Sequence, residues 1–198
     1  RDTVARDQLD VDASENGTSV FAVEPGGLEL MDLPLTLTWN LTAPRSGLGL
    51  ALRGGVELPT GDESRGYGNG GLDGSIGVLL EHDLEAARCY GHLQHTFAGS
   101  RRPRPGTTFE FADVSSAALG IEVALTDNLC GFVQAEYETS TLRPLDIPNV
   151  AREQMLIWVG GRYRVLDGSA IEFALGEDLK GHVSPDFTAW LSFATGLW

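Results

Sequence analysis

The chain has 198 residues, with 14 basic and 28 acidic side chains and a formal net charge of −14. This acidic balance argues against a nucleic-acid partner, because a phosphate backbone needs a basic surface. No apolar run is long enough for a membrane helix, so a helical membrane protein is excluded. A membrane β-barrel stays open, because alternating strands leave the mean hydropathy near neutral, and here it is −0.07.

The first 29 residues carry a turn signal rather than a long strand pattern. Asn16-Gly17 favours a two-residue turn, so we expect a hairpin within a long N-terminal loop. An alternative count takes "TSVFAV" as a tenth barrel strand, but this segment is short. Polar residues alternate in "DVDASENG" as at the start of a calcium loop, but Glu15 occupies the sixth position, where such loops need Gly.

Nine later segments show the period-2 alternation of apolar and polar residues that is typical of β-strands. Only "LEAARC" has a helical pattern, and it is too short to be stable alone. The chain is therefore predicted to be all-β and antiparallel. The predicted strands are residues 30–41, 47–59, 73–83, 87–98, 114–126, 128–140, 153–165, 168–177 and 185–198.

Each predicted strand has an apolar and a polar face. The apolar face holds, among others, Leu50, Leu52, Val78, Leu80, Ile121, Val123, Ile157 and Phe173. The polar face holds the candidate lumen-facing residues, Arg53, Glu57, Glu81, Glu122, Glu136, Arg162, Arg164 and Glu172. Cys89 falls on the apolar face and Cys130 on the polar face, so no disulfide is expected between them.

The connections between the predicted strands alternate between short and long. Turns such as "TDN" and "LDG" alternate with loops such as "GSRRPRPGTTFEFAD". Outer-membrane barrels have this arrangement, with tight periplasmic turns and long extracellular loops. A soluble sandwich also has alternating faces, but nothing requires its long loops to share one end. We therefore expect residues 30–198 to form an antiparallel transmembrane β-barrel and residues 1–29 an extracellular loop.

Outward aromatic residues are predicted at both ends of the strands. Trp39 and Tyr163 fall near the short turns, and Phe97, Tyr137 and Phe187 fall near the long loops. Two such girdles are typical of rings at the lipid headgroup layers.

The stretch around the second and third strands resembles a known family. Its motif is a strand end followed by a Gly-rich loop and a new strand start: Leu58, Pro59, Thr60, Gly61, Asp62, then Gly68, Gly70, Gly71 and Asp73. This pattern is similar to an uncharacterised bacterial outer-membrane β-barrel family, known only as a domain of unknown function. The resemblance spans most of the chain and implies a bacterial outer-membrane location. Related barrels with this motif are proposed to transport hydrophobic compounds.

The resemblance also implies that N-terminal strands are missing, because "RDTVARDQL" is similar to a loop midway along that family. The topology points the same way. Bacterial single-chain barrels have an even strand number and periplasmic termini, whereas the first of these nine strands starts on the loop side. We expect about three further strands, and about twelve in the intact barrel.

The expected function is that of an outer-membrane channel for small solutes or hydrophobic compounds, or of a structural membrane protein. The charged inner residues would select solutes by charge, or Arg–Glu pairs would fill a narrow barrel as a plug. The alternative is a soluble antiparallel β-barrel that binds an apolar ligand inside.

No enzyme activity, cofactor or metal is predicted. His95 is expected on the outer face beside Thr96, but the residue spacing assembles no Ser–His–acid set. "GYGNGG" lacks the Lys-Ser/Thr and the following helix of a phosphate loop, and is interpreted as a flexible surface loop. The cysteines form no CxxC motif.

One basic loop stands out in the acidic chain. "SRRPRPG" carries Arg101, Arg102 and Arg104 on a predicted extracellular loop. Arg side chains bind phosphate groups bidentately, so outer-membrane lipid and lipopolysaccharide are the predicted partners. The alternative is a solvated loop stiffened by its prolines.

Overall fold

A computed structural model of the chain describes residues 11–15, 18–23, 29–42, 47–65, 67–99, 110–145, 152–180 and 187–195. Helical structure in this part of the chain consists of two short turns, η2 (Glu63–Arg65) and η3 (Arg143–Leu145). Neither these turns nor any other described segment is a helix of the length and hydropathy needed to cross a membrane.

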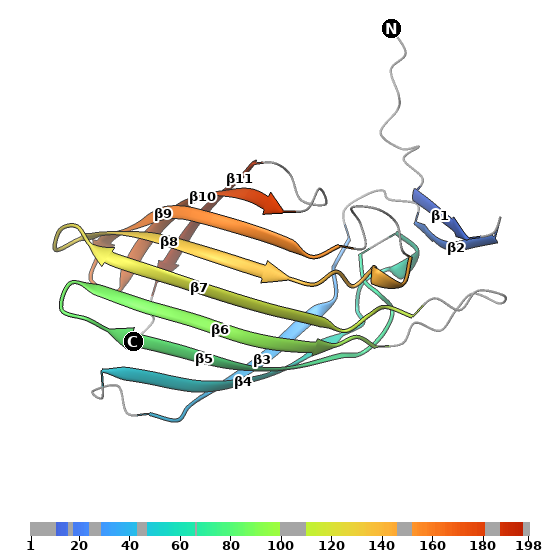
Figure 1. The fold of residues 1–198 in the computed structure, drawn as a ribbon, viewed down its shortest axis with the longest axis horizontal. Coiled ribbons are helices and arrows are strands. Elements are labelled where there is room, and N and C mark those ends of the chain that lie inside the picture. The colour runs from blue at the N-terminus through green and yellow to red at the C-terminus, as the bar shows by residue number, and fades with distance from the viewer. Residues whose placement is uncertain are drawn as a thin grey trace, which may run out of the picture.

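Nine antiparallel strands form one sheet, which confirms the predicted all-β fold (Figure 1). The strand ends differ from the predicted ones by at most three residues. The strands are β3 (Leu33–Asn40), β4 (Leu48–Leu58), β5 (Asp73–Asp83), β6 (Ala87–Phe97), β7 (Val114–Ala124), β8 (Leu129–Glu138), β9 (Gln154–Leu166), β10 (Ser169–Lys180) and β11 (Phe187–Thr195).

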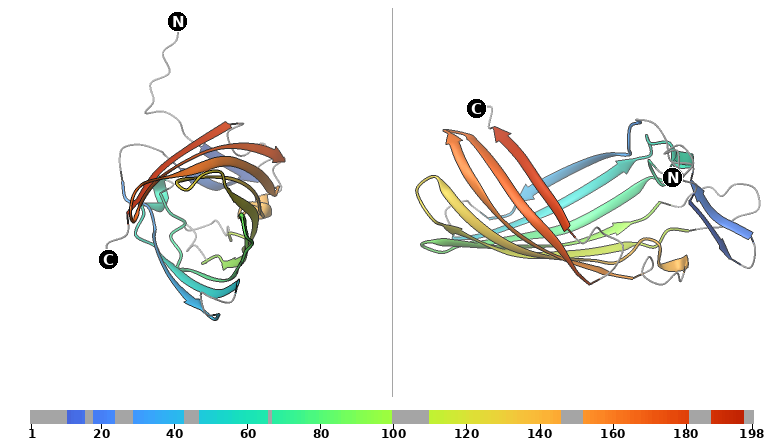
Figure 2. Two further views of the ribbon diagram at one scale, coloured as in Figure 1. Left: turned by 90° about the vertical axis from the view of Figure 1, so that its left-hand side faces the viewer. Right: turned by 90° about the horizontal axis from the view of Figure 1, so that it is seen from above.

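Each strand of the sheet pairs with its neighbour in the sequence, so the order runs from β3 to β11 without a crossover. The sheet curls strongly around a central axis (Figure 2). Its edge strands, β3 and β11, are not paired with each other in the described structure. The sheet is therefore curled and open.

The connections alternate between the two ends of the sheet, as antiparallel pairing requires (Figure 1). Residues 41–47, 84–86, 125–128 and 167–168 make the turns at one end. Residues 59–72, 98–113, 139–153 and 181–186 make the connections at the other end, and the first three of these are longer than any connection at the first end. We call these the turn end and the loop end.

Strand register divides the side chains into two faces, because directly opposed residues in an antiparallel pair point to the same side. The inner face is the one that carries Arg53, which lies opposite Thr38 and Gly77, and Arg162, which lies opposite Cys130 and Glu172. The outer face carries the residues that alternate with the inner-face residues along each strand, such as Leu52 and Ile121.

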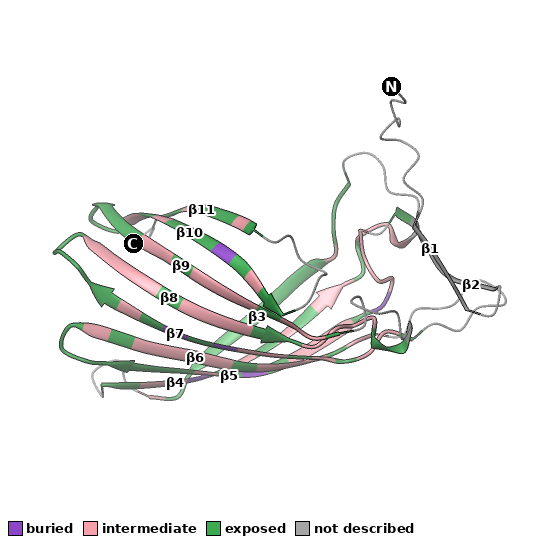
Figure 3. Cartoon of the chain, turned by 45° about the horizontal axis from the view of Figure 1, so that its top comes forward, coloured by how far each residue is buried: buried purple, intermediate pink, exposed green. Residues whose placement is uncertain are grey.

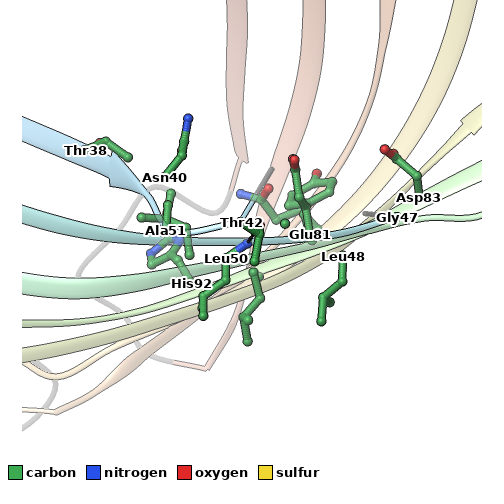
Figure 4. Close-up of a pocket in the computed structure, with 16 residues that line it drawn as sticks. Thr38, Asn40, Thr42, Gly47, Leu48, Leu50, Ala51, Glu81, Asp83 and His92 are labelled. Atoms are coloured by element: carbon green, nitrogen blue, oxygen red, sulfur yellow. Dashed lines mark hydrogen bonds between the residues drawn. The ribbon is translucent and has the colours of Figure 1, made fainter. Parts of the chain in front are cut away.

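The inner face is concave. Asn40 of β3 and Gln134 of β8 are five strands apart in the sheet, yet both line one pocket. In the close-up of this pocket, Asn40, Glu81 and Asp83 point to one side of the sheet, and Leu48 and Leu50 point to the other (Figure 4). The two faces therefore differ in polarity as well as in curvature.

The sheet buries little apolar surface. The buried hydrophobic residues among those described are Ala51, Ala118 and Ala174, all on the inner face. Large apolar side chains on the outer face are exposed instead, with exposed fractions of 70% for Leu119 and 64% for Leu93 (Figure 3). A soluble β-protein normally places such residues in a core, so this sheet has an unusual distribution of apolar surface.

The loop between β4 and β5 is held by hydrogen bonds that the sequence did not predict. The Asp32 carboxylate accepts the backbone N–H groups of Gly61 at 2.8 Å and Asn69 at 3.1 Å. Asp73 accepts the backbone N–H of Gly99 at 2.6 Å and the side-chain amide of Asn69. The Gly-rich loop is therefore attached both to the chain before β3 and to the chain after β6.

The N-terminal segment contributes a separate two-stranded sheet. β1 (Val11–Glu15) pairs antiparallel with β2 (Thr18–Val23), and neither strand joins the nine-stranded sheet. "TSVFAV" is therefore part of a hairpin in the described structure rather than a tenth strand of the large sheet.

Candidate functional site on the inner face

An ion-pair network on the inner face joins residues from three strands, β7, β9 and β10. Arg162 of β9 lies 3.1 Å from a carboxylate oxygen of Glu122 on β7. Its Nε and one terminal nitrogen donate hydrogen bonds to Glu172 of β10, at 3.0 and 2.8 Å. These three candidate lumen-facing residues therefore form one cluster, in which a single guanidinium is shared by two carboxylates.

The other five candidate lumen-facing residues also lie on the inner face, but outside this cluster. Arg53 donates a hydrogen bond to Thr38 at 3.3 Å, and Glu136 accepts one from Gln134 at 2.5 Å. The strand register puts the other three on the inner face, because Glu57 lies opposite Asp73, Glu81 opposite Tyr90, and Arg164 opposite Ala170.

Four aromatic residues lie on the inner face beside the ion-pair network, and sequence analysis did not identify them. Each stands opposite a very small residue on a neighbouring strand. The pairs are Tyr90 with Gly120, Phe132 with Gly160, Trp158 with Gly176, and Trp190 with Ala174. The signal that could have found them is a large aromatic residue on one strand at the same face as a glycine on the next.

The glycines leave room for these rings. A Cβ atom added at Gly176 would lie 2.7, 2.7 and 2.9 Å from three bonded ring atoms of Trp158. Such similar distances mean that the face of the indole, not its edge, lies over the glycine. At Gly160, an added Cβ would lie 2.4 Å from the backbone carbonyl oxygen of Phe173 and 2.6 Å from Cζ of Phe132. Larger residues at these glycines would displace the rings from the wall.

The four aromatic residues, Arg162 and Glu172 line a pocket of about 410 Å³ that extends across the inner face from β6 to β11. This volume lies within the range of about 300–1,000 Å³ that is typical of small-ligand sites. The pocket mixes polar and apolar groups, since Gln134, Glu136 and Arg162 also line it. The described part of the inner face is therefore not filled by Arg–Glu pairs alone.

Trp158 has a further property that matters for this pocket. Its indole N–H is buried and has no hydrogen-bond partner in the described structure. The polar edge of the ring therefore makes no bond, and the ring is held by packing on the wall.

The structure also brings together a serine, a histidine and an aspartate near the loop end of the outer face. His95 Nδ1 lies 3.0 Å from Ser115 Oγ, and His95 Nε2 lies 3.6 Å from the Asp113 carboxylate. The second distance is too long for a hydrogen bond, and the Ser115 N–H already donates to the Thr139 hydroxyl. The His95–Ser115 contact therefore links β6 to β7, while His95 and Asp113 are not hydrogen-bonded.

The basic loop and the metal ligands were two further points of the sequence analysis. Arg101, Arg102 and Arg104, the candidate lipid-phosphate ligands, lie outside the described residues. Among the residues that are described, no group of three or more His, Cys, Asp or Glu side chains is placed to hold a metal ion. Cys89 and Cys130 are free thiols.

The outward aromatic residues lie on the outer face at its two ends. Trp39 and Tyr163 lie near the turn end, with exposed fractions of 67% and 51%. Phe97, Tyr137 and Phe187 lie near the loop end and are also exposed.

Comparison with known proteins gives one family. A family model described as "Protein of unknown function (DUF3187)" matches residues 1–197. No curated protein matches the chain.

Proposed function

Because the chain belongs to the DUF3187 family of proteins of unknown function, we propose a function from the two faces of its sheet. The sheet is the wall of a bacterial outer-membrane β-barrel, with its outer face in lipid and its inner face along a path for small solutes.

The exposed apolar outer face is the observation that carries this proposal. Soluble monomers rarely expose large contiguous apolar patches, because exposed apolar surface is unfavourable in water. Here the outer face presents Leu52, Val78 and Ile121 on consecutive or nearby strands, all exposed. Lipid is a solvent in which this surface is favourable, and a closed barrel is the form in which strands span it.

The aromatic residues at both ends of the outer face support the same orientation. Trp and Tyr side chains prefer the membrane–water interface, where one part of the ring is apolar and the other is hydrated. The loop end, which has the three longest connections, corresponds to the extracellular side in such a barrel.

The open edges at β3 and β11 set a further requirement. In lipid, each unpaired backbone N–H or C=O group costs several kcal/mol, so an open sheet edge is not stable there. The proposal therefore requires further strands, or another partner, to pair with both edges in the membrane.

The inner face supports solute passage rather than a purely structural role. Its ion-pair network occupies one part of the wall, while a pocket of about 410 Å³ lies beside it. The side chains of this part of the wall therefore leave space for a small solute.

The facing of two neighbouring residues on β7 tests the proposal. Spin labels placed singly at Ile121 and Glu122, in protein reconstituted into vesicles, report contact with oxygen dissolved in lipid and with a water-soluble quencher. We expect Ile121 to be reached by oxygen, and Glu122 to be shielded from it. If the label at Ile121 is shielded from lipid and the protein stays soluble without detergent, the soluble barrel with an apolar ligand is the better description.

A further inference from the structure

We infer that the pocket between β6 and β11 binds small organic cations, such as alkylated ammonium compounds. This inference rests on the proposed function, since it names the solute class that the inner face would pass. Three features of the pocket lead to it: the orientation of the aromatic rings, the net charge of the neighbouring side chains and the arrangement of the rings across the wall.

The rings present the surface that attracts cations. The face of an aromatic ring is electron-rich, and a cation placed over it within about 6 Å of its centre is attracted, most strongly by Trp. Trp158 lies with one face over Gly176, which leaves its other face turned away from the wall. Trp190 and Phe132 line the same pocket.

The charge of the pocket has the matching sign. Arg162 is its one guanidinium among the described lining residues, and it is shared by Glu122 and Glu172. Glu136 adds a third carboxylate, so these four groups sum to a charge of −2. Arg88, which lies opposite Glu122, is paired with Asp83 at 2.6 Å, so these two charges leave the sum unchanged. A cationic solute would compensate this charge, whereas an anion would be repelled.

The positions of the rings suit passage rather than tight enclosure. Tyr90, Phe132, Trp158 and Trp190 come from β6, β8, β9 and β11, so they form a row across the wall and not a closed cage. A cation can then exchange one ring for the next, which gives the weak, repeated binding that conduction requires.

The test compares choline with its uncharged isostere, 3,3-dimethylbutan-1-ol, which has the same shape without the charge. Binding is measured by isothermal titration calorimetry of the full chain in a polyoxyethylene detergent, at constant ionic strength set with NaCl. We expect choline to bind at least tenfold more tightly than the isostere. Equal binding of the two probes, or no binding of choline, would overturn the inference.

Variants locate the site. Trp158→Ala should weaken choline binding about 5- to 30-fold. Trp158→Phe should weaken it less, and it removes no hydrogen bond because the indole N–H makes none. Glu136→Gln should also weaken choline binding and leave the isostere unaffected. Trp39→Phe, on the outer face, is the control and should bind choline like the unmodified protein.

Membrane insertion is measured separately with the Ile121 label, so the two ideas fail independently. A protein that inserts into vesicles but does not distinguish choline from its isostere refutes this inference alone. A protein that binds choline selectively but never enters vesicles refutes the membrane proposal and leaves the cation site in place.

Discussion

A series of arginine substitutions along the outer face of β7 tests whether this face lies in lipid, as proposed. Leu119 is the sixth residue of the eleven in β7, and Ile121 and Val123 follow on the same face toward the turn end. In the proposed barrel, with a rise of about 3.4 Å per residue and a strand tilt of about 40°, they would lie about 5 and 10 Å from Leu119 along the membrane normal.

The expected cost falls with this depth. An outward Arg costs about 2–4 kcal/mol at the midplane and about 0–1 kcal/mol near the interface of an apolar band about 25 Å tall. We therefore expect about 2–4 kcal/mol for Leu119→Arg, about 1–2.5 for Ile121→Arg and at most about 1 for Val123→Arg.

The assay is reversible urea unfolding of the protein in phosphatidylcholine vesicles, followed by tryptophan fluorescence. Glu122→Gln, between two of these positions but on the inner face, should change the free energy of unfolding by less than any midplane arginine. The reasoning is refuted if the three arginine variants lose equal stability, within about 0.5 kcal/mol. A solvent-exposed outer face predicts that result, because surface substitutions rarely change stability by more.

Three other predictions concern regions at the loop end. Asp32→Ala removes the acceptor of two backbone N–H groups, and each bond to the carboxylate contributes about 1.5–3 kcal/mol. Hydrogen exchange in residues 59–72 should therefore speed up at least tenfold in Asp32→Ala and by less in Asp32→Asn. Unchanged exchange would contradict the role of these bonds. The hydrogen bond from Lys180 is the main cause that lowers the pKa of Glu153 below its ordinary value of 4.5, so this contact stabilises the fold above that value and is lost as the pH falls through the lowered pKa. Lys180→Met should raise the pKa of Glu153 toward its ordinary value in a ¹³C NMR titration, and identical titration curves would disprove the pairing. Replacing Arg101, Arg102 and Arg104 of the "SRRPRPG" loop with Gln should reduce the amount of lipopolysaccharide that co-purifies with the protein. An unchanged amount would show that these arginines are not its ligands.

The strands and their faces could be predicted from the sequence because a period of two is a local property. Leu52 and Arg53 point to opposite faces whatever their strands pair with, so alternation alone assigns them. Contacts across strands depend on register, which local patterns do not give. His95 and Ser115 lie directly opposite each other, but the 16 residues 98–113 separate their strands in the sequence.

The inner aromatic residues were missed for a different reason. Phe132 and Trp158 have the parity of the polar face, but as apolar residues they were not expected among its charged side chains. They become recognisable only when Gly160 and Gly176 are seen opposite them, since the missing side chains make the space that the rings occupy. The hydrogen bonds of Asp32 could not be predicted from residue spacing either, because they join residues 29 and 37 positions apart in the sequence.

The sequential order of the nine strands has a kinetic consequence. Since every strand pairs with the strand before it in the chain, the sheet can grow one hairpin at a time, and each addition closes only a short loop. Local pairing of this kind is fast, and it keeps the number of unpaired edges at two throughout growth. The one pairing that chain proximity does not supply is at β3 and β11, so the step that satisfies those edges is expected to be the slowest in assembly.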